Sequence, residues 1–140
     1  MILLDASALL AVFLPHQMHH AECSSALAGA EPPWILSPFV VAEIDYMIEK
    51  FAGVQGELLF LQELATGVYE LPPFTAEDVA AAATVVEQYR SLNIGLADAS
   101  IVVLAERYGT RDILTLDERH FRAIRPLTGR KSFRLLPADS

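Results

Sequence analysis

The segment Ile2-Leu3-Leu4-Asp5-Ala6-Ser7-Ala8 decides the fold class of this chain. Ile2-Leu3-Leu4 is a short apolar run that ends at an acid, and residues 6–14 favour a helix that Pro15 stops. A short run that is apolar throughout is typical of a strand buried on both faces. The segment therefore predicts a buried strand followed directly by a helix.

The same pattern recurs along the chain. Residues 34–36 form a second apolar run, and Ser37-Pro38 then favours a helix start, with serine as the cap and proline in the first turn. Further strands are expected at residues 68–71, 113–116 and 132–136, the last at an edge. Helices are expected at residues 17–30, 38–53, 54–65, 75–90 and 96–108. Short strands alternating with helices predict an α/β fold with a parallel sheet covered on both faces.

Two helical stripes are expected to face the core. In the helix after Pro38 the stripe is Val40, Ile44, Met47 and Phe51, and after Gly53 it is Val54, Leu58, Leu61 and Ala65.

Composition places the chain among ordinary folded domains. With 140 residues, 53% of them apolar and 20% charged, we expect one domain over residues 1–140 and no intrinsic disorder. Cys23 is the only cysteine, so no intrachain disulfide can form. The apolar N-terminal run has no basic segment before it and is too short to cross a bilayer. We therefore expect no signal peptide, no transmembrane helix and a cytoplasmic protein.

The charge is unevenly distributed. The net charge of −8 argues against a protein that simply coats nucleic acid with positive charge. Residues 1–106 hold 14 acids and two bases, whereas residues 107–140 hold eight bases and four acids. The last quarter is therefore either a basic patch that contacts phosphates or an ordinary solvated surface.

Four acids occupy positions that are costly for a charge or suited to a ligand. Asp5 and Asp117 each follow a predicted strand, and ligands of parallel sheets bind beyond the carboxyl ends of the strands. Glu43 lies at the edge of an apolar helical stripe, and Asp98 shares a helix face with apolar residues. Each acid could instead cap a helix or pair with an arginine.

The scarcity of bases favours an external cation over protein cations. Lys50 and Arg90 are the only bases in the first 106 residues, and buried carboxylates need a partner. Oxygen ligands without histidine or cysteine spacing suit Mg²⁺ or Mn²⁺ rather than Zn²⁺. Such ions serve phosphate chemistry, and a basic patch nearby would hold the flanking phosphates of a polymer.

The acids and their neighbours resemble the signatures of a known family. Asp5 in Ile-Leu-Leu-Asp-Ala-Ser-Ala, Glu43 in Val-Ala-Glu-Ile, Asp98 in Leu-Ala-Asp-Ala-Ser-Ile and Asp117 in Thr-Leu-Asp-Glu-Arg-His-Phe look like the four acidic motifs of PIN domains. In order and spacing the chain is similar to the VapC toxins of VapBC toxin–antitoxin modules, and the resemblance covers nearly the whole chain.

The resemblance implies a fold, an activity and partners. It implies a three-layer α/β/α sandwich around a mainly parallel sheet and a Mg²⁺- or Mn²⁺-dependent endoribonuclease. The enzyme would be a homodimer inhibited by a VapB antitoxin, within a larger hetero-oligomer in some cases. Metal-bound hydroxide would attack phosphorus in line, leaving a 5′-phosphate and a 3′-hydroxyl.

The resemblance also assigns roles to individual residues. Asp5, Glu43, Asp98 and Asp117 would hold the metal and orient water, with Ser7 and Thr115 supporting the acids. The apolar residues of the early helices are candidate antitoxin contacts, with the core as the alternative: Leu9, Leu10, Phe13, Met47, Phe51, Leu58 and Leu59.

Neighbouring residues leave several alternatives open. Arg119 and Arg122 are candidates for RNA phosphate contacts, His120 for a general base and Glu118 for a spare ligand. For each of them a solvated or packed role is the alternative.

Other classes of protein fit less well. A receiver-type phospho-acceptor domain needs a lysine after a late strand, which neither lysine of this chain provides. A haloacid-dehalogenase-like phosphatase needs a second aspartate where Ser7 stands. A catalytically inactive PIN-like binding module is the more serious alternative, and the four intact acids argue against it.

Overall fold

Four short parallel strands form the centre of the molecule. The computed structural model describes residues 1–129 and 131–140, so Arg130 of the basic C-terminal quarter lies outside the described residues. The strands are β1 (Ile2–Leu4), β2 (Trp34–Ile35), β3 (Asp112–Leu114) and β4 (Arg134–Leu136). They lie in the order β2-β1-β3-β4, and every pairing is parallel. The predicted parallel sheet is therefore confirmed.

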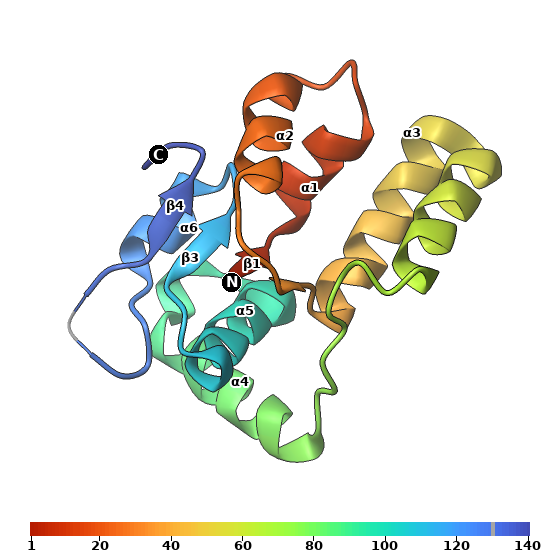
Figure 1. The fold of residues 1–140 in the computed structure, drawn as a ribbon. Helices are drawn as coiled ribbons and strands as arrows, with labels where there is room; N and C mark the ends of the chain where they lie inside the picture. The colour runs from red at the N-terminus through yellow and green to blue at the C-terminus, as the bar shows by residue number, and fades with distance from the viewer. Residues whose placement is uncertain (130) are drawn as a thin grey trace.

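Helices cover both faces of the sheet. They are α1 (Ala6–Phe13), α2 (His20–Ala28), α3 (Pro38–Ala65), α4 (Ala76–Gln88), η1 (Arg90–Leu92), α5 (Gly95–Tyr108) and α6 (Glu118–Ala123). Helices α1 and α2 pack together on one side of the sheet, and α4 and α5 pack together on the other (Figure 1). This arrangement confirms the three-layer α/β/α architecture. No described helix combines the length and apolar character needed to cross a membrane.

The central strands are buried because both of their faces meet helices. Leu3 of β1 lies opposite Ile35 of β2 and Ile113 of β3, and all three side chains are fully buried. Apolar side chains on both faces of a strand are the pattern expected of a sheet covered on both sides. This burial explains why three-residue apolar runs are enough to mark the strands in the sequence.

Helix α3 folds back on itself at Gly53. The φ of +69° and ψ of −175° at this residue break the helix into two arms, which lie side by side (Figure 1). Such dihedral angles are open essentially to glycine alone. The predicted helix end at Gly53 is therefore confirmed.

Of the two apolar stripes predicted to face the core in this region, the first is half correct and the second is wrong. Val40 and Ile44 are buried as expected, but Ile48 continues the buried line in place of Met47 and Phe51. In the second arm the buried residues are Phe60 and Leu64. The expected Val54, Leu58, Leu61 and Ala65 are exposed. The two arms of α3 form a helical hairpin, the α3 hairpin, whose tip at Gly53 extends away from the sheet (Figure 1). No described helix or strand covers the outer faces of this tip, so its apolar side chains are exposed.

Two smaller boundaries also differ from the sequence prediction. The predicted strand at residues 68–71 is reduced to one parallel bridge between Glu70 and Ile35. The second helix begins at His20 rather than at residue 17, because His19 has a left-handed φ of 69° that interrupts helical geometry.

Candidate active site

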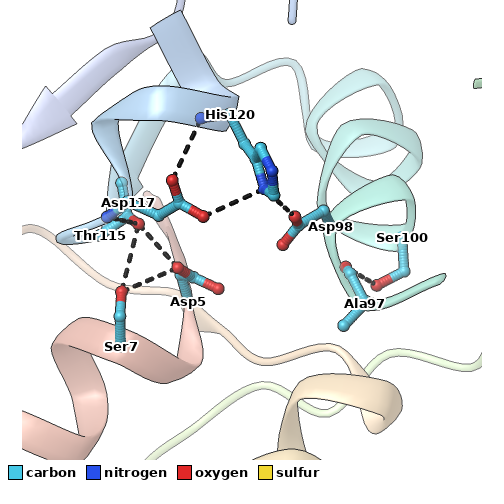
Figure 2. Close-up of polar contacts among 8 residues, drawn as sticks. All are labelled: Asp5, Ser7, Ala97, Asp98, Ser100, Thr115, Asp117 and His120. Carbon is cyan, nitrogen blue, oxygen red and sulfur yellow. Dashed lines mark hydrogen bonds and ion pairs between the residues drawn. The ribbon is translucent and has the colours of Figure 1, made fainter. Parts of the chain in front are cut away.

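Three aspartates meet at the carboxyl edge of the sheet. Asp5 follows β1, and Asp117 lies three residues beyond Leu114, the last residue of the adjacent β3. Asp98 comes from the first turn of α5 and faces them (Figure 2). Because β1 and β3 are parallel neighbours, their carboxyl ends open on the same side. The topology thus brings Asp5 together with two acids that lie more than 90 residues later in the sequence.

Two hydroxyl groups hold the Asp5 carboxylate in place. Thr115 Oγ1 donates to Asp5 Oδ2 at 2.6 Å, and Ser7 Oγ donates to the same oxygen at 2.9 Å. These hydroxyls also accept from backbone N–H groups, Thr115 from Asp117 at 2.9 Å and Ser7 from Leu116 at 3.0 Å. The network fixes Asp5 to the segment that carries Asp117 (Figure 2).

Burial shapes the acidity of Asp5. The residue is only 5% exposed, and this desolvation raises the pKa of its carboxyl group above the ordinary value. Hydrogen bonds from Thr115 and Ser7 oppose the rise in pKa, whereas the charge of Asp117 adds to it. A positive charge beside Asp5 would therefore be strongly favoured.

The Thr115→Val variant tests the support given to Asp5. Valine keeps the shape of threonine but removes the hydroxyl that bonds Asp5 and Asp117, so buried polar groups lose a partner. We expect the free energy of unfolding to fall by about 1–3 kcal/mol. Urea denaturation measures this change. Thr84→Val, at an exposed helical threonine, is the control and should change stability by less than about 0.5 kcal/mol. Equal effects of the two substitutions would contradict the supporting role.

Asp98 is held at the N-terminal end of α5. Ser100, two residues later, donates to the Ala97 carbonyl at 2.6 Å and shares a hydrogen bond of 2.6 Å with Ser37, the N-cap of α3. This buried contact ties the N-cap of α3 to the N-terminal half of α5. The helices that carry Glu43 and Asp98 are therefore fixed relative to each other.

The pKa of Asp98 is raised to about 7. Burial of its carboxyl group is the largest cause, and the charges of Asp5 and then Asp117 also raise it, while His120 lowers it. The three aspartates thus repel one another across a partly buried space. A cation between the three carboxylates would relieve this repulsion.

His120, a candidate general base in the sequence analysis, joins the cluster. Asp117 caps α6 by accepting from the His120 backbone N–H at 3.1 Å, which turns the imidazole back toward the acids. Its Nδ1 atom lies 2.9 Å from Asp98 Oδ2 and 3.1 Å from Asp117 Oδ2 (Figure 2). The spacing of three residues after a helix-capping aspartate was the available signal. The contact with Asp98 depends on tertiary structure.

Glu43 interacts electrostatically with Asp5. As a whole residue, Glu43 is exposed on the first arm of α3. Its carboxyl group is nevertheless partly buried, and this burial, followed by the negative charge of Asp5, raises the pKa of Glu43. No hydrogen bond of its side chain occurs within residues 1–129 and 131–140. Glu43 is therefore near enough to Asp5 to feel its charge and free to bind a ligand.

The donor set fits a divalent cation. Ligand atoms of Asp98, Asp117 and His120 lie within 4.8 Å of one another, and Asp5 and Glu43 add carboxylates around this group. In the described part of the chain, no arginine or lysine forms an ion pair with any of the four acids. Clustered carboxylate oxygens are suited to hard ions such as Mg²⁺ and Mn²⁺.

The two candidate phosphate-binding arginines differ in their surroundings. Arg122 bonds Glu118 and Asp139, at 2.9 and 2.7 Å, so its charge is largely neutralised and Glu118 is occupied as well. Arg119 is exposed beside His120 on α6 and forms no ion pair within the described residues. Arg119 is therefore the better placed of the two to meet a phosphate.

The aspartates range from the buried Asp5 to the partly exposed Asp117. A cavity of about 1000 Å³ lies elsewhere, between α2 and the C-terminal segment, and its walls include Thr115 and Glu118 but none of the four acids. The Asp117 side chain is 33% exposed at the rim. Solvent and ions can therefore reach the cluster from the side of Asp117.

Comparison with known proteins identifies the family of this chain. A family model described as the PIN domain matches residues 2–126. Ribonuclease VapC26 of Mycobacterium tuberculosis is 45% identical over 136 residues, which cover 97% of this chain and 100% of that protein.

Solved structures share the fold at low sequence identity. VapC20 of Mycobacterium tuberculosis, described as a sarcin-ricin loop cleaving toxin, has a TM-score of 0.81 at 16% identity, over 88% of this chain and 95% of that chain. A chain of a toxin-antitoxin complex from Klebsiella pneumoniae has a TM-score of 0.68 at 17% identity, over 94% of this chain and 99% of that chain. The family model, the curated relative and the shared fold agree, and the chain therefore belongs to the PIN-domain family, in its VapC group.

Proposed function

We propose that this protein is a Mg²⁺- or Mn²⁺-dependent endoribonuclease that acts as the toxin of a toxin–antitoxin pair, with residues 1–140 forming a single nuclease domain. Its membership of the family and its 45% identity to a protein named Ribonuclease VapC26 make it a ribonuclease. The observation that supports the metal dependence is that Asp98 and Asp117 lie together beside Asp5, with Glu43 near enough to feel the charge of Asp5, and that none of these acids has an arginine or lysine partner in the described residues.

The four acids would hold the metal. When bound, a divalent ion supplies a more acidic water and neutralises the charge of the phosphate. Hydrogen bonds from Thr115 and Ser7 hold the Asp5 carboxylate in place, so Asp5 would determine the position of the bound ion. Glu43, exposed and free of hydrogen bonds within the described residues, is suited to orient the attacking water and take its proton.

The products follow from the use of water as the nucleophile. Water attacks phosphorus in line with the leaving 3′-oxygen, so cleavage leaves a 5′-phosphate and a 3′-hydroxyl. The 2′-hydroxyl of RNA takes no part as a nucleophile, and no cyclic phosphate forms.

The decisive experiment combines metal dependence with analysis of the RNA ends. Purified protein is incubated with a mixed RNA substrate in EDTA and then with added Mg²⁺ or Mn²⁺. We expect cleavage only after the ion is added, with 5′-phosphate ends on the fragments. Cleavage in EDTA, or fragments that carry 2′,3′-cyclic phosphates, would contradict the mechanism.

Arg119 is proposed to contact an RNA phosphate. The Arg119→Ala variant should bind single-stranded RNA more weakly and should flatten the plot of log affinity against log salt by about 0.7, the value for one phosphate contact. Fluorescence anisotropy over a range of salt concentrations measures both quantities. Arg90→Ala is the control, since Arg90 is exposed at the start of η1 and pairs with Glu87. An unchanged salt slope in Arg119→Ala would exclude the contact.

An antitoxin of the VapB type is the proposed protein partner. The structural relative from Klebsiella pneumoniae comes from a toxin-antitoxin complex. Among the expected contact residues, Phe51, Leu58 and Leu59 are exposed on the α3 hairpin, and Leu10, Phe13 and Met47 are partly buried. Leu9 is fully buried and belongs to the core. The apolar hairpin is therefore the surface that we assign to the antitoxin, and a homodimer remains the expected state of the toxin.

An inactive binding module is the second candidate function. The exposed apolar hairpin favours it, because a partner could bind there without any catalysis. Binding of an antitoxin by a protein that cleaves no RNA at saturating Mg²⁺ and Mn²⁺ would establish this alternative.

A further inference from the structure

The imidazole of His120 stands between two carboxylates of the candidate active site. Its Nδ1 atom lies 2.9 Å from Asp98 Oδ2 and 3.1 Å from Asp117 Oδ2. The ring carries at most one Nδ1–H, so the two carboxylate oxygens share a single proton in a three-centre hydrogen bond.

The same three atoms are spaced like neighbouring ligands of one ion. Two ligands at right angles around an octahedral ion, with bonds of about 2.1 Å, are about 3.0 Å apart. Both separations that involve Nδ1 are close to this value, and Asp98, Asp117 and His120 each offer one ligand atom within 4.8 Å of the others. Nδ1 therefore already lies at the distance from each carboxylate that neighbouring ligands of one cation have.

The ring is held in this position from both sides. The backbone N–H of His120 donates to Asp117 Oδ1 at 3.1 Å, which leaves Oδ2 of that aspartate facing the ring. The next residue, Phe121, is fully buried against Phe133 and anchors α6 to the core. The His120 side chain is 20% exposed, so solvent ions can reach it.

From this geometry we propose that His120 is a specificity-determining residue, whose Nδ1 serves as a nitrogen ligand and makes the site favour Mn²⁺ over Mg²⁺. The inference rests on the proposed function, because it places the nitrogen in the same metal site as the acids. Mg²⁺ binds oxygen ligands and keeps much of its water, whereas imidazole nitrogen is a better ligand for transition-metal ions. Acids alone would leave the two ions closely matched.

Pulsed electron paramagnetic resonance tests the nitrogen ligand directly. Spin-echo modulation of the Mn²⁺-loaded protein should show coupling to a bound ¹⁴N nucleus. His120→Ala should remove this coupling, and His120→Gln repeats the test if the alanine variant does not fold. His16→Ala, at an exposed histidine in the segment between α1 and α2, is the matched control and should keep the signal. Absence of nitrogen coupling in the wild-type protein would overturn the inference.

Calorimetric titration with each ion alone tests the preference. In His120→Ala we expect the affinity for Mn²⁺ to fall by about 10- to 100-fold, the range typical when a group that shapes a metal site is lost. The affinity for Mg²⁺ should change by less than about threefold, because the oxygen ligands remain. Equal losses for both ions, or no loss for either, would contradict the proposal.

Asp98→Asn separates this inference from the proposed function. If the wild type binds Mn²⁺ without nitrogen coupling and Asp98→Asn abolishes binding, the acids hold the ion and only the role of His120 fails. If the wild type binds neither ion, the metal-dependent function fails as well, and the inference fails with it.

Discussion

Asp98→Asn should lower the rate of RNA cleavage by about 10³-fold. Asparagine keeps the shape of the side chain but removes a charge that faces the proposed ion. A metal ion contributes several kcal/mol to transition-state stabilisation, and each 1.36 kcal/mol lost costs about a factor of ten in rate. Single-turnover cleavage of a labelled RNA at saturating Mg²⁺ measures the loss.

A matched control separates this effect from a general change in charge. Glu49 is an exposed acid on α3, the helix that also carries Glu43, and it does not belong to the acidic cluster. Glu49→Gln should cleave within about twofold of the wild type, as expected for a surface substitution away from the site. If Asp98→Asn kept more than a tenth of the wild-type rate, Asp98 would not be an essential ligand.

The stability of the metal-free protein should fall as the pH rises. Asp98 has a pKa of about 7 in the folded protein against an ordinary value of 3.8, and the pKa values of Asp5 and Glu43 are also raised. At pH values between 3.8 and about 7, the Asp98 carboxyl group binds more protons in the folded state than in the unfolded state. Stability therefore decreases with increasing pH through this window, because each proton lost leaves a buried, repelled carboxylate. Thermal unfolding in a chelator, from pH 5 to pH 8, measures the trend.

Divalent ions should restore this stability mainly at the higher pH. At an ion concentration of 100 times the dissociation constant, binding adds about 2.7 kcal/mol, which raises the melting temperature of a domain of this size by about 5–10 °C. At pH 5 the protonated acids bind the ion weakly, and the rise should be small. Asp98→Asn should reduce both the loss of stability with rising pH and the stabilisation by divalent ions. An equal rise at both pH values, or a melting temperature that increases with pH in chelator, would contradict the account.

The sequence predicts the framework of the fold because the strands are buried on both faces. Ile2-Leu3-Leu4 and Ile113-Leu114 are apolar throughout for that reason, and the acids that follow them mark the edge of the sheet. Their parallel pairing then follows from the helices between them. The positions of Asp5 and Asp117 were therefore accessible from local pattern.

The burial of the α3 hairpin was not accessible in the same way. Helical periodicity shows which residues share a face, but it does not show whether another element covers that face. Phe51 and Leu58 are on apolar faces, yet they are 54% and 44% exposed because the hairpin tip leaves the core. Phe60 is buried because it meets Phe13 of α1, with ring centres 5.2 Å apart.

The contacts of His120 show that sequence-based prediction has the same limit at the candidate site. Its contact with Asp117 is local and follows from the capping of α6, but Asp98 is 22 residues away on another helix. No periodicity links these two positions. The histidine became a credible ligand only when the packing of α5 against the sheet was known.

A crystal soaked in Mn²⁺ and measured for anomalous scattering tests the central claim most directly. The account predicts a strong anomalous peak bounded by the carboxylates of Asp5, Asp98 and Asp117. A fully occupied Mn²⁺ peak elsewhere in the molecule, with these three carboxylates unliganded, would contradict it.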